Sequence, residues 1–253
     1  MPNDDARHES SAKCSAGFRG HGPHRRGGIR STSVNAADEL PDPHDLFPVG
    51  FFSRADERPD DRFYESDRLV THIDDRAIRA IGRLYEHLGI TGRVLDLMSS
   101  WVSHFRTSPA ELTVLGMNAH ELAANVMATE RIVHDLNLDP RMPFDANRFD
   151  AAVCCVSIDY LIRPIDVIRD VARVVVPGGL LICTFSNRCF PTKAIRGWLS
   201  MSDEQHCRLV VDYIRLAGGW APAEVALCTP PQTPGDPLYA VWARRGPDGA
   251  RAP

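Results

Sequence analysis

Short apolar runs alternate with helical patterns over most of the chain, and this alternation limits its fold more than any other feature. The order predicts an α/β fold with a doubly wound, mostly parallel sheet that helices cover on both faces. Asp74 is placed to cap the first long helix, and Ser202 and Gln205 have the spacing of a capping box before the last. A link rich in proline and glycine joins the last two runs, which predicts an antiparallel pair. The predicted strands lie at 94–97, 112–117, 131–134, 149–156, 180–185, 223–228 and 238–243, and the main predicted helices at 75–88, 119–129, 165–174 and 203–217.

Changes in composition divide the chain into four parts. Residues 1–39 contain scarcely any large apolar side chain and are expected to form a disordered tail, with an organelle transit peptide over 10–35 as the alternative. Residues 40–74 are rich in proline and aspartate but carry aromatic side chains, which need a surface to pack on. The folded domain is expected at 75–245, followed by a second disordered tail at 246–253.

Charge and cysteine usage exclude several classes of function. The net charge of −4 provides no basic field for nucleic acid or for an anionic membrane, so neither is expected as a partner. The number of cysteines is odd, at seven, and three of them lie inside predicted strands, which favours a reduced, cytoplasmic location. No pair of cysteines has the spacing of a zinc site, so no metal is expected.

Polar residues follow the predicted strands, at the edge of the sheet where a doubly wound fold binds its ligand. This position makes them the candidate functional residues. They are Asp96 and residues 98–104 after the first strand, Asn118 after the second, Asp135 and Leu136 after the third, Ser157, Asp159 and Tyr160 after the fourth, and Asn187 and Arg188 after the fifth.

A set of short motifs gives the chain a family resemblance from 78 to 244. The motifs are Val94-Leu95-Asp96-Leu97, Met142-Pro143-Phe144, Phe149-Asp150, Tyr160-Leu161, Arg163-Pro164 and Arg173-Val174-Val175-Val176-Pro177-Gly178-Gly179. Together they resemble the class I S-adenosylmethionine-dependent methyltransferases of the type 11 group. The resemblance implies a seven-stranded Rossmann-like sheet with an antiparallel last strand, S-adenosyl-L-methionine as cofactor, and an N-terminal segment, here 40–74, that covers the cofactor cleft like a lid.

The first loop departs from the family pattern because it contains no glycine. Met98, Ser100 and Val102 stand where the family has small residues that let the backbone approach the cofactor. In one interpretation Ser99, Ser100 and backbone N–H groups bind the carboxylate of the cofactor, and Trp101 lies near the sulfonium, where a cation–π contact is worth about 1 kcal/mol. In the other, the loop has closed over an emptied site and Trp101 belongs to the core.

The resemblance also assigns the rest of the cofactor site. It implies that Asp96 orients the loop and the cofactor's amino group, and that Asp135 and the Leu136 backbone recognise adenine. Asn118 replaces the usual acidic residue at the ribose, so weaker binding is expected there. Asn118 and Asp135 have an alternative interpretation as turn-forming or capping residues. Tyr64, Met98 and Ser157 complete the predicted cofactor-binding set.

Methyl transfer depends mainly on alignment and requires a base only when the acceptor carries a proton. His104 is the preferred base because an ordinary histidine titrates near neutrality, although it is equally interpreted as a residue at a helix start. Asp159 and Tyr160 are predicted to contact the substrate. The predicted function is methylation of a small-molecule acceptor by in-line transfer, and the alternative is a degenerate, non-catalytic domain that binds the cofactor or a partner. The acceptor and the oligomeric state stay open.

Overall fold

The computed structural model describes residues 41–230 and 234–247, so the tail expected at 1–39 and all but the first two residues of the tail expected at 246–253 lie outside the described residues. One seven-stranded sheet has the order β3-β2-β1-β4-β5-β7-β6, in which β7 runs antiparallel to both of its neighbours and the remaining pairs are parallel. The predicted fold class is confirmed. The strands are β1 (Arg93–Leu97), β2 (Glu111–Gly116), β3 (Glu130–Val133), β4 (Phe149–Cys155), β5 (Val175–Phe185), β6 (Glu224–Leu227) and β7 (Tyr239–Arg244).

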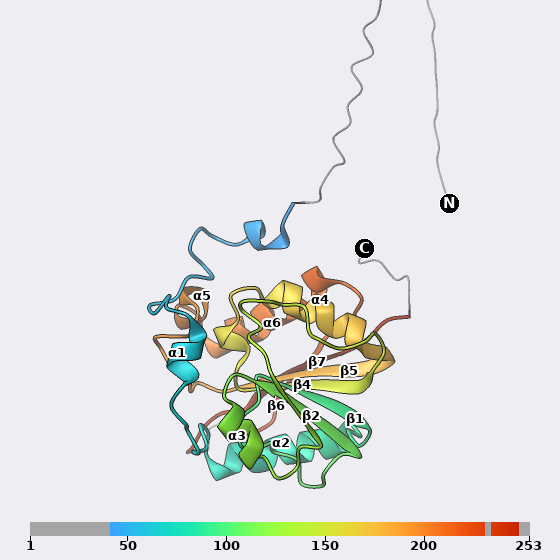
Figure 1. Ribbon diagram of the computed structural model, residues 1–253. Coiled ribbons are helices and arrows are strands. Elements are labelled where there is room, and N and C mark those ends of the chain that lie inside the picture. The colour runs from blue at the N-terminus through green and yellow to red at the C-terminus, as the bar shows by residue number, and fades with distance from the viewer. Residues whose placement is uncertain (1–40, 231–233, 248–253) are drawn as a thin grey trace, which may run out of the picture. The chain divides into compact units, whose positions relative to one another are not determined.

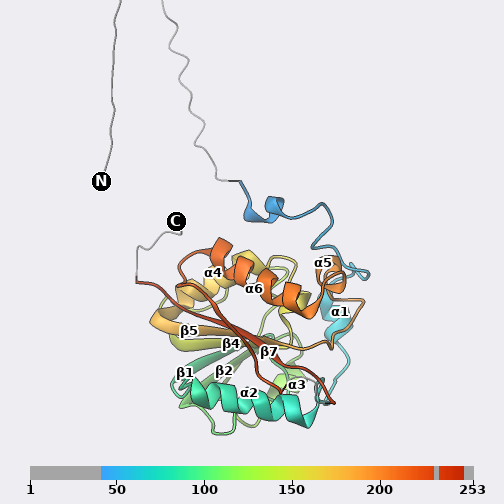
Figure 2. The same cartoon turned by 180° about the vertical axis from the view of Figure 1, so that it is seen from behind.

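Helices cover both faces of the sheet and enclose two apolar cores. Figures 1 and 2 show α4 and α6 on one face and α2 on the other. Phe149, Phe185 and Tyr213 belong to the core on the side of α4 and α6, whereas Ile81 and Val153 belong to the core on the side of α2. The helices are η1 (Pro43–Leu46), α1 (Asp60–Tyr64), α2 (Asp75–His87), α3 (Ala119–Ala124), η2 (Ile158–Tyr160), α4 (Pro164–Val174), α5 (Arg196–Leu199) and α6 (Asp203–Ala217).

The capping predictions are confirmed, but helix α3 is shorter than the helix that the sequence pattern predicts at 119–129. Asp74 accepts the backbone N–H of Ala77 at the start of α2, and the capping box of Ser202 and Gln205 opens α6. Helix α3 ends at Ala124 and not at 129, because Asn125 has an extended backbone. The Asn125 amide donates instead to the carbonyl of residue 100 and to the hydroxyl of residue 103, in the loop after β1. A tertiary contact therefore replaces the last turns that the helical pattern predicts.

The N-terminal segment, residues 41–74, packs against α6 at its start and then pairs with the chain just before α5. Phe47 and Phe52 pack their rings within 6.2 Å of Tyr213 in α6. Arg54 forms an isolated antiparallel bridge with Ile195, just before α5. Figure 1 shows α1, which belongs to this segment, beside α5. The segment is thus held by apolar packing at one point and by backbone pairing at another.

Candidate active site

A cavity of about 400 Å³ opens at the C-terminal ends of β1, β2, β3 and β4. Residues of the N-terminal segment, among them Asp60, Arg68 and His72, form part of its wall. The cavity gathers most of the predicted site residues from separate strand ends, as the topology of the sheet leads one to expect. The predicted residues that line it are Tyr64, Asp96, Met98, Ser99, Ser100, His104, Asn118, Asp135, Leu136, Ser157 and Tyr160.

The loop after β1 turns tightly although it has no glycine. Met98 itself adopts the left-handed backbone conformation, with φ of +53°, which costs a residue with a Cβ on the order of 1 kcal/mol. The space for the turn comes from β2, because a Cβ added to Gly116 would lie 2.2 Å from the carbonyl oxygen of Ser99. The Ser99 N–H donates to the Leu115 carbonyl at 2.8 Å. Gly116 therefore lets the backbone of this loop pass close against β2.

Asp96 places a buried carboxyl group in the floor of the cavity. Its side chain is 4% exposed, and its Oδ2 accepts the hydroxyl hydrogens of Ser99 at 2.8 Å and Ser103 at 2.6 Å. Burial raises the pKa of Asp96 to about 6, and the two serine hydroxyls oppose that rise. Within the described residues Oδ1 accepts no hydrogen bond. The carboxyl group is ionised at neutral pH and has one oxygen left for a ligand.

Glu121 of α3 is a cavity residue that the sequence reasoning missed. It is 7% exposed, its Oε1 accepts the backbone N–H of Arg68 at 2.6 Å, and its Oε2 accepts the hydroxyl of Ser100. The Ser99 and Ser100 hydroxyls thus donate to carboxylates of the chain itself, so a ligand carboxylate at this loop is left with backbone N–H groups. The position of Glu121, three residues after the capping Asn118, was the available signal.

Asn118 caps helix α3 and also bonds to the N-terminal segment. This agrees with its alternative interpretation as a capping residue. Its Oδ1 accepts the backbone N–H groups of His120 and Glu121, at 2.8 and 3.0 Å. Its Nδ2 donates to the carbonyl of Tyr64 at 3.0 Å and to the carboxylate of Asp67 at 2.9 Å. These contacts occupy the amide that was predicted to hold the ribose, and they fasten the N-terminal segment to α3.

Asp135 forms a turn and still faces the cavity. Its Oδ1 accepts the N–H groups of Asn137 at 2.8 Å and Leu138 at 3.2 Å, while Oδ2 accepts no hydrogen bond from the described residues. Leu136, next in the chain, is buried and lines the cavity. The two predicted interpretations of Asp135, turn former and ligand acceptor, are compatible because they use different oxygens.

Trp101 and Asp159 are predicted cofactor and substrate residues that the structure places outside the cavity wall. The Trp101 indole donates to the Val70 carbonyl at 3.1 Å, so it neither plugs the cavity nor faces a ligand in it. Asp159, in η2, is 3% exposed, and burial raises its pKa to about 8. It is therefore protonated at neutral pH. The predicted substrate contact of Asp159 is wrong for this arrangement, because the short η2 helix turns the side chain into the protein interior.

His104 lines the cavity, but it does not titrate near neutrality as predicted. Burial, with a smaller contribution from the nearby His72, lowers the pKa of His104 to about 4. Burial also lowers the pKa of His72, against the opposing charge of Glu121. Both imidazoles are therefore neutral at pH 7. They provide hydrogen-bonding groups without a net charge on this side of the cavity.

Tyr160 and Arg188 lie on the wall that follows β4 and β5. The Tyr160 hydroxyl accepts the backbone N–H of Phe190 at 2.9 Å and so fixes the loop after β5. Arg188 donates to Asp236 at 3.1 Å while its side chain stays largely exposed. Of the two candidate residues that follow β5, Arg188 lines the cavity and Asn187 does not.

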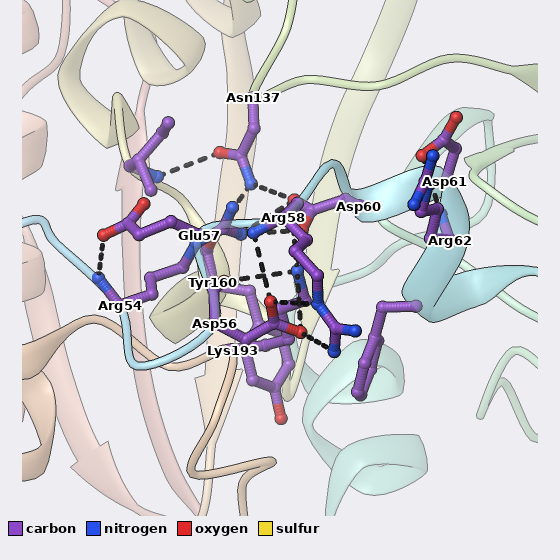
Figure 3. Close-up of polar contacts among 12 residues, drawn as sticks. Arg54, Asp56, Glu57, Arg58, Asp60, Asp61, Arg62, Asn137, Tyr160 and Lys193 are labelled. Atoms are coloured by element: carbon purple, nitrogen blue, oxygen red, sulfur yellow. Dashed lines mark hydrogen bonds and ion pairs between the residues drawn. The ribbon is translucent and has the colours of Figure 1, made fainter.

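A buried ionic cluster fastens the N-terminal segment to the sheet beside this cavity (Figure 3). Asp60 accepts hydrogen bonds from Arg54 at 2.8 Å to both oxygens, and it pairs with the Nζ of Lys193 at 2.9 Å. Asn137, from the loop after β3, donates to the same carboxylate at 2.8 Å and to the carbonyl of Tyr160 at 3.0 Å. Lys193 is 0% exposed, and Arg54 and Asp60 are each 5% exposed. We call Arg54, Asp60, Asn137 and Lys193 the Asp60 cluster.

Comparisons with known proteins agree with this architecture. Residues 89–183 match the family model described as a methyltransferase domain. None of the curated proteins matches the chain. Among solved structures, a putative methyltransferase from Haloferax volcanii in complex with the activator Trm112 is 12% identical, with 76% of this chain and 95% of that chain covered and a TM-score of 0.50. The [4+2]-cyclase SpnF is 17% identical, with 67% of this chain and 81% of that chain covered and a TM-score of 0.48. Phosphoethanolamine N-methyltransferase 2 from Haemonchus contortus, in complex with S-adenosyl-L-methionine, is 13% identical, with 67% of this chain and 52% of that chain covered and a TM-score of 0.47.

The family match and the sheet agree on the kind of domain that this enzyme contains. Residues 89–183 match a methyltransferase domain, and they lie in a seven-stranded sheet whose β7 is antiparallel. Its methyltransferase domain resembles the type 11 group of class I, and its cofactor is S-adenosyl-L-methionine. Within the described residues, no helix is long and apolar enough to span a membrane.

Proposed function

We propose that the enzyme methylates a small-molecule acceptor that binds inside the cavity, by in-line transfer from S-adenosyl-L-methionine. The observation that carries the proposal is the cavity itself, whose volume of about 400 Å³ falls in the range of small-ligand sites. Residues of the N-terminal segment contribute to its wall, so an acceptor there is shielded from water. A wall of this kind favours a compact acceptor.

The residues of the cavity fit the cofactor. The oxygen of Asp96 that accepts no hydrogen bond suits an ammonium group. The backbone N–H groups of Ser100 and Trp101 donate to none of the described residues, so they are available to a carboxylate. Asp135 Oδ2 and the Leu136 backbone would recognise adenine. When bound, S-adenosyl-L-methionine supplies a methyl group activated by its sulfonium. The chain's own residues then have to orient the acceptor and, where it carries a proton, remove that proton.

His104 is the residue proposed to take that proton. It is unprotonated at neutral pH, which lets it accept a hydrogen bond, but a pKa of about 4 makes it a weak base. We expect His104→Ala to lower kcat about tenfold, below the usual contribution of a general base, without changing the affinity for S-adenosylhomocysteine. His87→Ala, at the exposed end of α2, is the matched control. Unchanged turnover in His104→Ala would remove this residue from the mechanism.

Calorimetric titration with S-adenosylhomocysteine tests the site directly. We expect the wild-type protein to bind this ligand, and Asp135→Asn to weaken its affinity about tenfold. Asparagine keeps the Oδ1 that forms the turn and replaces the other acceptor with a donor, so the loss of one charged hydrogen bond is isolated. No heat with the wild-type protein at millimolar ligand would favour the non-catalytic alternative, and unchanged affinity in Asp135→Asn would exclude the adenine role.

A further inference from the structure

A second hollow, of about 210 Å³, lies on the N-terminal segment itself and has a different chemical character. Arg58, Arg62 and Arg68 line it together with Asp56, Pro59, Phe63 and Ser66. Three arginines therefore line one space whose wall includes a single acidic residue. Like charges repel when they are brought together, and such a cluster is typical of sites that bind a phosphate or a carboxylate.

Two of the three guanidinium groups have no acidic partner within the described residues. No hydrogen bond or ion pair of the described chain reaches the guanidinium of Arg62. The guanidinium of Arg68 donates only to carbonyl oxygens, those of Phe63 at 2.8 Å and Ser66 at 3.2 Å, and it lies 4.4 Å from the centre of the Phe63 ring. Arg58 is paired with Asp56, and this pairing holds the pKa of the Asp56 carboxyl well below its usual range. The one carboxylate of the hollow is thus already neutralised.

The backbone around the hollow is held in place from behind. The buried ammonium of Lys193 donates to the carbonyl oxygens of Arg58 at 2.8 Å and Asp56 at 3.3 Å. Figure 3 shows Lys193 beneath this stretch, with Arg58 reaching to Asp56. The ring of Phe63 and two carbonyl oxygens fix the plane of Arg68 in the same way. An arrangement that is fixed before binding loses less entropy when it takes up a ligand.

Arg68 connects this hollow to the reaction cavity, because it lines both. Its guanidinium also lies 5.6 Å from the ring of Phe190, on the cavity wall. We propose that Arg58, Arg62 and Arg68 form an oxyanion subsite, which binds a phosphate or carboxylate group next to the methyl-transfer cavity. The group belongs either to a free anion or to a ligand that extends into the cavity.

Inorganic phosphate is the first probe, because its binding requires neither cofactor nor acceptor. The measurement is the affinity for phosphate, by calorimetry and by the rise in Tm, against sodium chloride of equal ionic strength. We expect phosphate to bind the wild-type protein, and Arg62→Gln to weaken that binding about tenfold. Arg83→Gln, an exposed arginine of α2 that lines neither hollow, is the matched control and should bind phosphate like the wild type.

Phenyl phosphate separates the two sources of the anion. If the group belongs to a ligand that reaches the cavity, phenyl phosphate should bind more tightly than inorganic phosphate; if it is a free anion, the two should bind equally. Either result supports the subsite when Arg62→Gln weakens it. Absence of a phosphate effect beyond that of chloride, or an equal effect on Arg62→Gln and Arg83→Gln, would overturn the proposal. Binding of S-adenosylhomocysteine, measured separately, keeps a failure of the methyltransferase site distinguishable from a failure of this one.

Discussion

Replacing Asp60 with asparagine is expected to lower the free energy of unfolding by about 3–5 kcal/mol. The change would leave Arg54 and Lys193 close together inside the protein without the carboxylate that both contact. A buried charge that loses its partner can recover neither its hydration nor its ion pair. Urea denaturation of the variant and the wild type at pH 7 measures the loss.

Asp61→Asn is the matched control, because Asp61 is the exposed neighbour on the same short helix and should cost at most about 0.5 kcal/mol. The double variant Asp60→Asn with Lys193→Met should recover part of the loss, since it removes one of the two buried cations, which would otherwise keep only the Asp56 carboxylate, at 3.6 Å, as an ion-pair partner in the described chain. The bound partners hold the pKa of Asp60 below its ordinary value of 3.8, against the effect of burial. The stabilisation is therefore complete at neutral pH and is lost as the pH falls below about 4. Equal stability of Asp60→Asn and Asp61→Asn would contradict a structural role for the Asp60 cluster.

Asp96→Asn is expected to weaken binding of S-adenosylhomocysteine by about ten- to a hundredfold. The variant keeps the shape of the side chain and removes the charge that we assign to the ligand's ammonium group. The wild-type affinity should also depend on pH, because the pKa of Asp96 is raised to about 6 and only the ionised form attracts a cation. Affinity should rise with pH through about 6 and level off above it, whereas Asp96→Asn should show no such step.

Asp159→Asn is the control for this experiment. Asp159 is also a buried carboxyl with a raised pKa, but it lies outside the cavity wall. Calorimetry from pH 5 to pH 8 should therefore give a wild-type affinity for Asp159→Asn. A pH step that persists in Asp96→Asn would assign the titrating group elsewhere, and a loss of affinity in Asp159→Asn would show that replacing any buried carboxyl disturbs the site.

The alternation of strands and helices was sufficient to predict the sheet, because each element is specified by its own apolar period and its own caps. Asp74 and the pair Ser202 and Gln205 mark helix starts through contacts within three residues, so they can be read locally. The end of α3 could not be predicted in this way. It is set by Asn125, whose amide bonds to a loop more than twenty residues earlier in the chain.

The candidate site was predictable in its location and less so in its chemistry. Strand ends in a parallel sheet converge, which is why most of the predicted residues share one cavity. The ionisation of His104 and Asp159 depends on burial, which a sequence pattern does not contain. The ion pair of Asp60 with Lys193 could not be predicted from the sequence either. The segment around Asp60 contains several aspartates, and only the fold determines which of them lies next to Lys193.

The complete burial of Lys193 sets the minimum length of a self-sufficient version of this enzyme. A truncation at residue 75, where the regular pattern of strands and helices begins, would delete the carboxylate and the carbonyl oxygens that solvate this ammonium, all of which come from residues 56–60. The truncated chain would keep the Lys193 ammonium without these partners, beside a cavity that had lost part of its wall. The smallest autonomous unit therefore starts ahead of Arg54, and the stretch that precedes the Rossmann-like core is as integral to it as any strand.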